Sequence, residues 1–156
     1  MLRALHAGFG QVAGKLNSLF RAELTLGVRL LALDRDGRVF LVRHSYLPGL
    51  HLPGGAVDLG ESCRQAAERE AREEGNLVCP EPPSLFHLYW NPMLGRRDHI
   101  ALFVARNVAQ TGPRPASLEI LAAGFHPTAR LPAGATDPTC RRLAEVLGDT
   151  PPSDRW

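Results

Sequence analysis

The stretch that decides the fold, GAVDLGESCRQAAEREAREEGNL, runs from Gly55 to Leu77. Its second half predicts a helix over Ser62 to Glu74. Ser62 and Gln65 form a capping-box pattern at its start, and the alanines that follow favour helical backbone. The first half is short, rich in glycine and free of any periodic apolar pattern, so it predicts a loop that leads into the helix.

The predicted helix carries three carboxylates on one face. Glu70, Glu73 and Glu74 stand at positions i, i+3 and i+4, which are neighbours on a helix surface. Like charges so close repel one another, and a hard divalent cation such as Mg²⁺, which takes oxygen ligands, would remove the repulsion. A run of Glu and Arg is also typical of a solvated helix face with ion pairs worth about 0.3–0.5 kcal/mol each.

The residues ahead of the helix weigh against a merely solvated face. An apolar Leu52-Pro53 pair leads into a Gly54-Gly55 turn, and an acid, Glu61, stands just before the capped helix. A carboxylate on Glu61 complements the positive end of the helix dipole. This combination is hard to obtain by chance, and it indicates a site built on the helix carboxylates.

The segment resembles the Nudix box. That pattern is Gly, five residues, Glu, seven residues, Arg-Glu, an aliphatic residue, any residue, Glu-Glu, any residue, Gly and an aliphatic residue. One position departs, because Asn76 stands where the pattern has Gly. Asn is the next most tolerant residue of a left-handed conformation at a helix C-terminus, so the fold is expected to survive. The matching positions are Gly55, Glu61, Arg69, Glu70, Glu73, Glu74 and Leu77, with Ala71 as a small version of the aliphatic residue.

The flanking sequence predicts a mixed sheet between helices, an α/β/α sandwich, and the resemblance implies the same Nudix-like fold. Residues 1–22 predict an additional amphipathic helix, 23–150 the Nudix domain and 151–156 a loose C-terminal tail. Asp36-Gly37 suits a tight hairpin turn between the first two strands. The remaining expected elements are strands at 24–33, 39–43, 84–90, 98–105 and 119–126, and a helix at 137–147.

The resemblance implies the chemistry of the site. Water attacks phosphorus in a nucleoside diphosphate linked to another moiety, or in a nucleoside triphosphate, with Mg²⁺ as the cofactor and Mn²⁺ as a substitute. Glu70 and Glu74 are the expected chief ligands, Glu73 a further ligand, and the Gly54 carbonyl a backbone ligand. The expected supporting residues are Gly55, Glu61 and Arg69, of which Arg69 pairs with a box carboxylate and fixes its rotamer.

The general base stays open between residues of the helix, Glu70 and Glu73, and Glu119 from a distant loop, with Asp98 a weaker alternative. Several other side chains border predicted strand ends and suit a phosphate or a base, but each is as typical of an ordinary structural residue. They are His44, His99, Arg29, Arg43, Arg96 and Arg97 for polar contacts, and Tyr89 and Trp90 for stacking on a nucleobase.

Composition restricts location and partners. With 44% hydrophobic and 22% charged residues the chain is typical of a soluble globular protein. Its net charge of +2 does not indicate long nucleic acid as a partner. Three widely spaced cysteines predict free thiols in a reducing compartment, and no apolar run approaches the ~18 residues of a membrane span. The expectations are a cytoplasmic protein with a small nucleotide-type substrate and no membrane contact, with a homodimer through the N-terminal helix left open.

Two readings compete with an enzyme. The first is a catalytically silent module with the same fold that binds a nucleotide or a protein, and its sign would be the loss of box acids, all of which are present here. The second is an unrelated α/β protein whose charged helix has only a structural role.

Overall fold

The computed structural model describes residues 24–92 and 97–156, although of Arg97 only the backbone. Its helices and strands are β1 (Leu24–Ala32), β2 (Val39–His44), α2 (Cys63–Gly75), β3 (Leu77–Val78), β4 (Ser84–Asn91), β5 (Arg97–Ala105), β6 (Ala109–Gln110), β7 (Ile120–His126) and α3 (Asp137–Leu147). The helix predicted for residues 1–22 lies outside this range. No helix within the described residues is long and apolar enough to cross a membrane.

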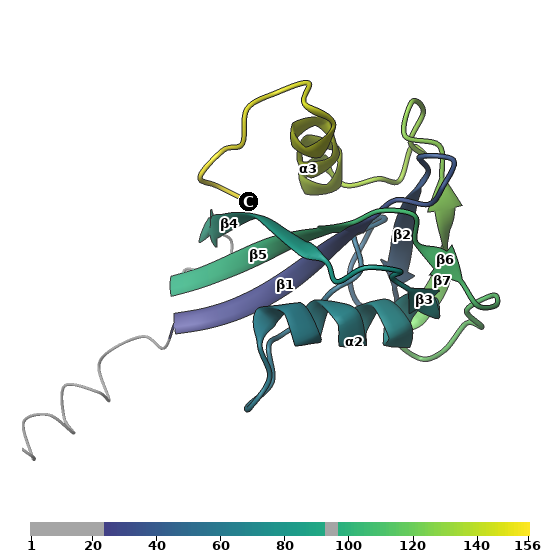
Figure 1. Ribbon diagram of the computed structural model, residues 1–156, viewed down its shortest axis with the longest axis horizontal. Coiled ribbons are helices and arrows are strands. Elements are labelled where there is room, and N and C mark those ends of the chain that lie inside the picture. The colour runs from purple at the N-terminus through teal and green to yellow at the C-terminus, as the bar shows by residue number, and fades with distance from the viewer. Residues whose placement is uncertain (1–23, 93–96) are drawn as a thin grey trace, which may run out of the picture.

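The centre of the molecule is a mixed sheet with a helix on each face (Figure 1). In it β1 runs parallel to β5, and β4 runs antiparallel to β5 on the other side. Two short antiparallel pairs, β2–β7 and β3–β6, extend the layer. Helix α2 lies below the sheet and α3 above it in Figure 1, which confirms the predicted α/β/α arrangement.

Two apolar clusters hold the layers together, one between the sheet and each helix. The cluster below the sheet includes Phe40 and the small residues Ala66, Ala67 and Ala71 of α2, which let the helix approach the strands closely. The cluster above the sheet includes Tyr89 of β4 and Leu143 of α3. Because α2 is held through its alanine face, its Glu-rich face is left for other contacts.

The predicted hairpin between β1 and β2 is only partly correct. The turn forms, with Gly37 at φ 74° and an Asp34 N–H bond to the Arg38 carbonyl at 3.0 Å, but a single bridge, Leu33 to Val39, joins the two strands. The loop that leads toward α2 lies between β1 and β2 and hydrogen-bonds to both strands. It receives the Leu30 N–H at the Pro53 carbonyl (2.9 Å), and it exchanges hydrogen bonds with β2 between Val42 and His51. The glycine turn is thereby fixed against β1.

The tail expected to be loose is packed against the domain, so that prediction is wrong. The Trp90 N–H donates to the Asp154 carbonyl (2.8 Å), and the Trp156 N–H donates to the Trp90 carbonyl (2.9 Å). The Trp156 ring is half-buried and meets the ring of Tyr89 edge-on at 5.4 Å. These backbone bonds continue the edge of β4 and bring Trp156 over the upper face of the sheet.

Candidate active site

Both ends of α2 are fixed, and this sets the direction of its carboxylates. At the start, Ser62 Oγ accepts from the Gln65 N–H, and Gln65 Oε1 accepts from the Ser62 N–H, as the capping box predicts. At the end, Asn76 takes the left-handed conformation (φ 51°) and its N–H bonds to the Arg72 carbonyl. Its side-chain amide also donates to the Pro113 carbonyl (3.1 Å), so Asn at this position adds a tie to the loop before β7.

The glycine turn approaches the helix so closely that side chains are excluded. Gly54 has φ 149°, and a Cβ there would collide with the Val28 carbonyl on β1. A Cβ on Gly55 would lie 2.9 Å from Cδ of Glu70 and still closer to Oε1. The Gly54 N–H donates to Glu74 Oε2 at 2.9 Å. The turn therefore holds one carboxylate with its backbone and makes room for the next.

Glu74 is a buried carboxylate in a crowded acidic site. It is 8% exposed, and burial raises its pKa to about 7, helped by the charge of Glu70 and opposed by the Gly54 N–H. The carboxylate of Glu119 acts in the same direction as that of Glu70. A cation placed between Glu70 and Glu74 would relieve both the burial cost and the repulsion.

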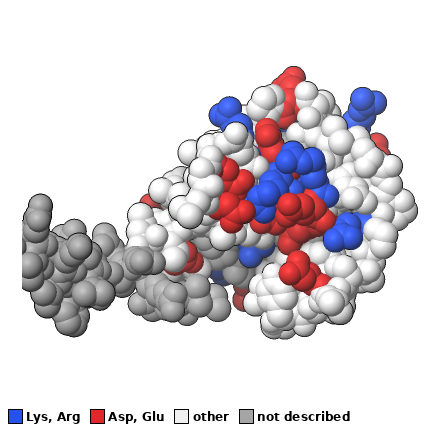
Figure 2. Space-filling model, turned by 90° about the horizontal axis from the view of Figure 1, so that it is seen from below, with Lys and Arg blue, Asp and Glu red and all other residues white. Residues whose placement is uncertain are grey.

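Arg69 links the acids of this region, as expected. Its guanidinium donates to Glu61 Oε1 at 2.7 Å, to Glu70 Oε1 at 2.8 Å and to the Ala56 carbonyl at 3.0 Å. The hydrogen bonds to Glu61 raise the pKa of Arg69 and lower that of Glu61. Figure 2 views this side of the molecule, where acidic and basic side chains gather together.

Glu73 differs from its two neighbours. Its side chain is 59% exposed, against 13% for Glu70 and 11% for Glu74, and it contacts Arg69 at 3.3 Å. Residues 24–92 and 97–156 contain no ready-made group of three His, Cys, Asp or Glu side chains around one metal position. The paired Glu70 and Glu74 nevertheless fit Mg²⁺, because this ion usually keeps several waters and uses only one or two carboxylates plus substrate phosphates.

Arg29 reaches the same turn from β1. Its Nη1 donates to the carbonyls of Leu52 and Gly54, both at 3.0 Å, so the Gly54 carbonyl that was predicted as a metal ligand already accepts one hydrogen bond. Burial lowers the pKa of Arg29, and the nearby charge of Glu74 opposes that shift. Arg29 thus brings a buried positive charge to the edge of the carboxylate pair, a contact that the sequence did not reveal.

The end of β2 supplies His44 behind Glu74. His44 Nε2 lies 3.5 Å from Glu74 Oε1, and neither ring nitrogen of this buried side chain has a hydrogen-bond partner within the part of the chain that the structure describes. Burial and then the charge of Arg29 lower the pKa of His44 to about 4, so the ring is neutral at pH 7. The loop containing Glu119 is tied to the same strand end, because the Ser45 N–H donates to the Glu119 carbonyl at 2.8 Å.

The other predicted contacts are not gathered here. Tyr89 is fully buried, and its hydroxyl donates to Glu145 at 2.6 Å, so of the two roles left open for it, base stacking and core packing, it has the second. Trp90 is 40% exposed and lies under the guanidinium of Arg155. Within residues 24–92 and 97–156, no hydrogen bond or ion pair joins His99 or Arg43 to the α2 carboxylates, and Arg96 and the Arg97 side chain lie outside the described residues.

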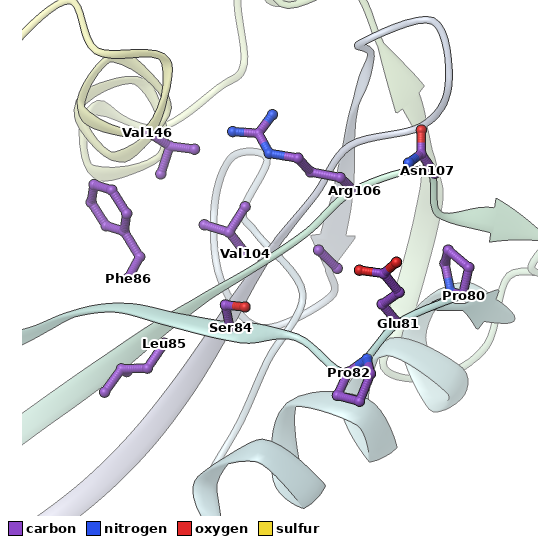
Figure 3. Close-up of a pocket in the computed structure, with 11 residues that line it drawn as sticks. Pro80, Glu81, Pro82, Ser84, Leu85, Phe86, Val104, Arg106, Asn107 and Val146 are labelled. Carbon is purple, nitrogen blue, oxygen red and sulfur yellow. The ribbon is translucent and has the colours of Figure 1, made fainter.

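A cleft of about 610 Å³ opens beside the carboxylates on the upper side of the sheet. Arg29 and Gly55 stand at one end of it, and Asp98, Asn91 and Trp156 line it further along. A smaller hollow of about 310 Å³ lies elsewhere, between the segment before β4, strand β5 and α3 (Figure 3). Arg29 and Gly55, which adjoin the α2 carboxylates, line the larger cleft and not that hollow, so the larger cleft is the candidate substrate site.

The fold and this carboxylate pair together define an α/β/α protein of the kind that the Nudix box predicts. A family model described as NUDIX domain matches residues 23–146. The chain belongs to the NUDIX family.

Three known proteins illustrate the similarity. An ADP-ribose pyrophosphatase of Methanocaldococcus jannaschii is 32% identical over 75 residues, which cover 46% of this chain and 44% of that protein. A putative 8-oxo-dGTP diphosphatase of Bacillus subtilis is 42% identical over 50 residues, covering 32% of this chain and 34% of that one. The chain thus spans less than half the length of these two curated relatives. The crystal structure of a MutT NUDIX hydrolase from Burkholderia pseudomallei superposes with a TM-score of 0.66 at 25% identity, covering 80% of this chain and 98% of that chain.

Proposed function

We propose that the protein is a Mg²⁺-dependent pyrophosphohydrolase. It cleaves a phosphoanhydride bond in a nucleoside diphosphate linked to another moiety, or in a nucleoside triphosphate, by attack of water at phosphorus. The observation that carries the proposal is the buried Glu74 carboxylate, which is bonded to the Gly54 N–H beside Glu70 and has its pKa raised to about 7. A buried carboxylate pair of this kind is costly unless a cation compensates it.

Different residues of the chain have different roles in the proposed binding of Mg²⁺. Glu70 and Glu74 would hold the Mg²⁺, and Arg69 fixes Glu70 through its 2.8 Å hydrogen bond. The Gly54 carbonyl remains available as a further ligand, because a carbonyl oxygen has two lone pairs and Arg29 uses one. When bound, Mg²⁺ neutralises phosphate charge and acidifies the attacking water. Mn²⁺, which also accepts oxygen ligands, is expected to replace it.

Glu73 is the preferred general base. A base must be ionised and must reach water, and Glu73 is the most exposed of the three helix carboxylates. In that role it takes the proton of the attacking water, and Arg69, 3.3 Å away, orients its carboxylate. Glu70 and Glu119 are the alternatives, and Glu119 lies close enough to affect the pKa of Glu74. Glu73 remains a further metal ligand if it turns toward Glu70.

The substrate is proposed to lie in the 610 Å³ cleft with its phosphates toward Arg29 and Gly55. A cavity of this size is in the range of small-molecule sites. The names of the two curated relatives, an ADP-ribose pyrophosphatase and a putative 8-oxo-dGTP diphosphatase, support a nucleotide substrate. A cytoplasmic location, the absence of membrane contact and a homodimer through residues 1–22 stay predictions.

The test is turnover by protein stripped of metal with a chelator and then given Mg²⁺ or Mn²⁺. Nucleotide sugars, dinucleoside polyphosphates and (deoxy)nucleoside triphosphates are offered, and nucleotide products are separated by chromatography. Glu74→Gln is expected to lose the metal-dependent activity. Glu68→Gln changes a carboxylate of the same helix that lies near Cys79 rather than near Glu74, and is expected to retain it. Binding without turnover of any compound would favour the silent module instead.

A further inference from the structure

His44 is a buried polar side chain at the end of β2. It is 3% exposed, and within residues 24–92 and 97–156 neither nitrogen of its ring has a hydrogen-bond partner. A buried polar group without a partner is costly, and the great majority of such groups in native proteins are satisfied. Glu74 Oε1 lies 3.5 Å from His44 Nε2, so a carboxylate faces one of the two nitrogens.

The end of β2 sets the direction of this ring. Phe40 and Val42 belong to the apolar cluster on the α2 side of the sheet, and His44 follows two residues later on the same side. The pairing of β2 with β7 also shifts between Arg43 and His44. Such a bulge bends a strand and redirects a side chain. These two features bring the ring against Glu74 of α2.

Two neighbouring rings restrict the orientation of the imidazole. The centroid of the Tyr46 ring lies 5.1 Å from that of the imidazole, and the centroid of the His51 ring lies 5.9 Å from it. His51 is itself fixed, because its N–H donates to the Val42 carbonyl at 2.8 Å and its Nε2 contacts the Pro48 carbonyl at 2.8 Å. The imidazole therefore has little freedom to turn away from Glu74.

The Glu74 carboxylate is approached from two sides. Its Oε2 accepts the Gly54 N–H at 2.9 Å, and its Oε1 faces His44. A carboxylate has about four acceptor positions, so a metal ion can still use either oxygen. A donor at Oε1 would restrict rotation of the carboxylate and would favour its ionised form, which is the form that binds Mg²⁺.

The position of the ring proton follows from the same geometry. A proton on Nε2 gives the carboxylate a donor, and a doubly protonated ring presents the same donor. A proton on Nδ1 alone would turn a lone pair toward a negatively charged oxygen and leave a buried N–H unpaired. The present 3.5 Å exceeds the about 2.7–3.2 Å of N–H···O hydrogen bonds, so an approach of roughly 0.5 Å completes the bond.

We propose that His44 is a positioning residue for the metal ligand Glu74. The His44 Nε2–H donates to Glu74 Oε1 and, together with the Gly54 N–H on Oε2, holds the carboxylate in one orientation for Mg²⁺. His44 acts through Glu74 and not on the substrate. This inference rests on the proposed function, because Glu74 is a metal ligand only if the site binds Mg²⁺.

Nitrogen-15 NMR of the metal-free full chain locates the ring proton without any activity. The His44 signals are assigned by their loss in His44→Gln. We expect a protonated Nε2, and we expect its resonance to move in Glu74→Gln, where the charged acceptor is replaced by a neutral one. A proton on Nδ1 with a bare Nε2, or an Nε2 resonance that Glu74→Gln leaves unchanged, would overturn the proposal.

Variants of His44 separate the donor from the packing. His44→Phe fills the space without a donor, and it is expected to weaken Mg²⁺ binding in calorimetry by about 10–100-fold. His44→Gln places an amide N–H near the position of Nε2, so its affinity is expected to stay within about threefold of wild type. His44→Asn places its amide nearer to Nδ1 and is expected to resemble His44→Phe. The matched control is His126→Phe at the other end of the β2–β7 pair, which should bind Mg²⁺ as wild type does.

The outcomes distinguish the positioning role from the proposed function. Equal Mg²⁺ affinity of wild type and His44→Phe, or equal losses in His44→Gln and His44→Phe, would overturn the positioning role and leave a metal-dependent pyrophosphohydrolase intact. A wild type that binds no Mg²⁺ would overturn both. If His44→Phe fails to fold, the comparison of His44→Gln with His44→Asn and the ring spectrum of the wild type decide.

Discussion

Substituting Gly55 by alanine tests the fit between the glycine turn and Glu70. Gly55 does not occupy a left-handed conformation, so alanine is not excluded by the backbone. The new Cβ would, however, lie 2.9 Å from Cδ of Glu70. Ordinary contacts between carbon atoms are about 3.5–4.0 Å. The Glu70 carboxylate must therefore retreat by roughly 1 Å, away from the turn and from its present position beside Arg69.

The expected result is a protein that folds but binds metal weakly. Changes that displace a ligand or its support typically cost about 10–100-fold in metal affinity. Loss of the hydrogen bond between Arg69 and Glu70 would lower the free energy of unfolding by only about 1 kcal/mol. Calorimetric titration of metal-free protein with Mg²⁺ measures the first effect, and thermal unfolding in chelator measures the second.

The matched control is Gly124→Ala on β7, where an added Cβ meets nothing within 4 Å. It should leave the Mg²⁺ affinity within about twofold of wild type. In a Glu70→Ala background the clash is gone, so Gly55→Ala should cost little further affinity. An unchanged Mg²⁺ affinity for Gly55→Ala, or a full additional loss in the Glu70→Ala background, would refute the argument.

Four further predictions test contacts of Glu74, Arg69 and Tyr89. The pKa of Glu74 in the folded protein is about 7, above its ordinary 4.5, so the protonated carboxyl stabilises the native state. As the pH rises from about 4.5 through 7, the free energy of unfolding of the metal-free protein should therefore fall by on the order of 3 kcal/mol relative to that of Glu74→Gln. Chemical denaturation measures this difference. For the same reason Mg²⁺ should bind roughly tenfold more weakly at pH 6 than at pH 8, because the ion requires the ionised carboxylate. Arg69→Lys should lower Mg²⁺ affinity by about 10–100-fold, since an ammonium does not reproduce the guanidinium fork between the acids, whereas Arg64→Lys on the exposed side of α2 should not. Tyr89→Phe should cost about 1–3 kcal/mol of stability in thermal unfolding, because Glu145 then loses a buried 2.6 Å donor.

Each of these has a clear contrary result. If wild type and Glu74→Gln show the same dependence of stability on pH, or if wild type binds Mg²⁺ equally at pH 6 and pH 8, Glu74 does not have the raised pKa. If Arg69→Lys and Arg64→Lys bind Mg²⁺ equally, Arg69 does not position the carboxylates. Thermal unfolding of Tyr89→Phe at the wild-type temperature would mean that its hydroxyl adds no stability. The control for Tyr89→Phe is Tyr46→Phe, because Tyr46 is 67% exposed in the wild type.

Local signals in the sequence located α2 and α3 correctly because the causes of these helices are local. A capping box at Ser62, alanines on one face and a residue that accepts the left-handed conformation at position 76 define α2 without reference to the rest of the chain. The five longer strands were also located, but not the short strands β3 and β6, and not which strands pair. The turn at Asp36-Gly37 forms, and yet the loop around Pro53 separates β1 from β2, because pairing depends on what the whole chain places between two strands.

The candidate site residues that belong to the motif could be predicted from the sequence. Those that long-range packing brings to the site could not. The carboxylates and their link to Arg69 follow from spacing on one helix. The approach of Arg29 to the Gly54 carbonyl depends on a loop crossing β1, and no periodic pattern reports that crossing. Trp156 stood in a segment rich in Pro and polar residues, which reads as loose, although its partners are the buried Arg142 and the edge of β4. The role of Tyr89 stayed open for a related reason, since a buried aromatic and a stacking aromatic look alike in sequence.

The central claim is tested most directly by hydrolysis in ¹⁸O-labelled water. Protein with Mg²⁺ is given the panel of nucleotide derivatives, and the products are examined by mass spectrometry. We expect a metal-dependent cleavage in which one ¹⁸O atom appears on a phosphate of a product, and no such label when Glu74→Gln replaces the wild type. Metal-assisted attack of water at phosphorus would be contradicted by ¹⁸O bonded to a carbon atom of a product, by equal cleavage in excess chelator, or by no cleavage of any compound with either Mg²⁺ or Mn²⁺.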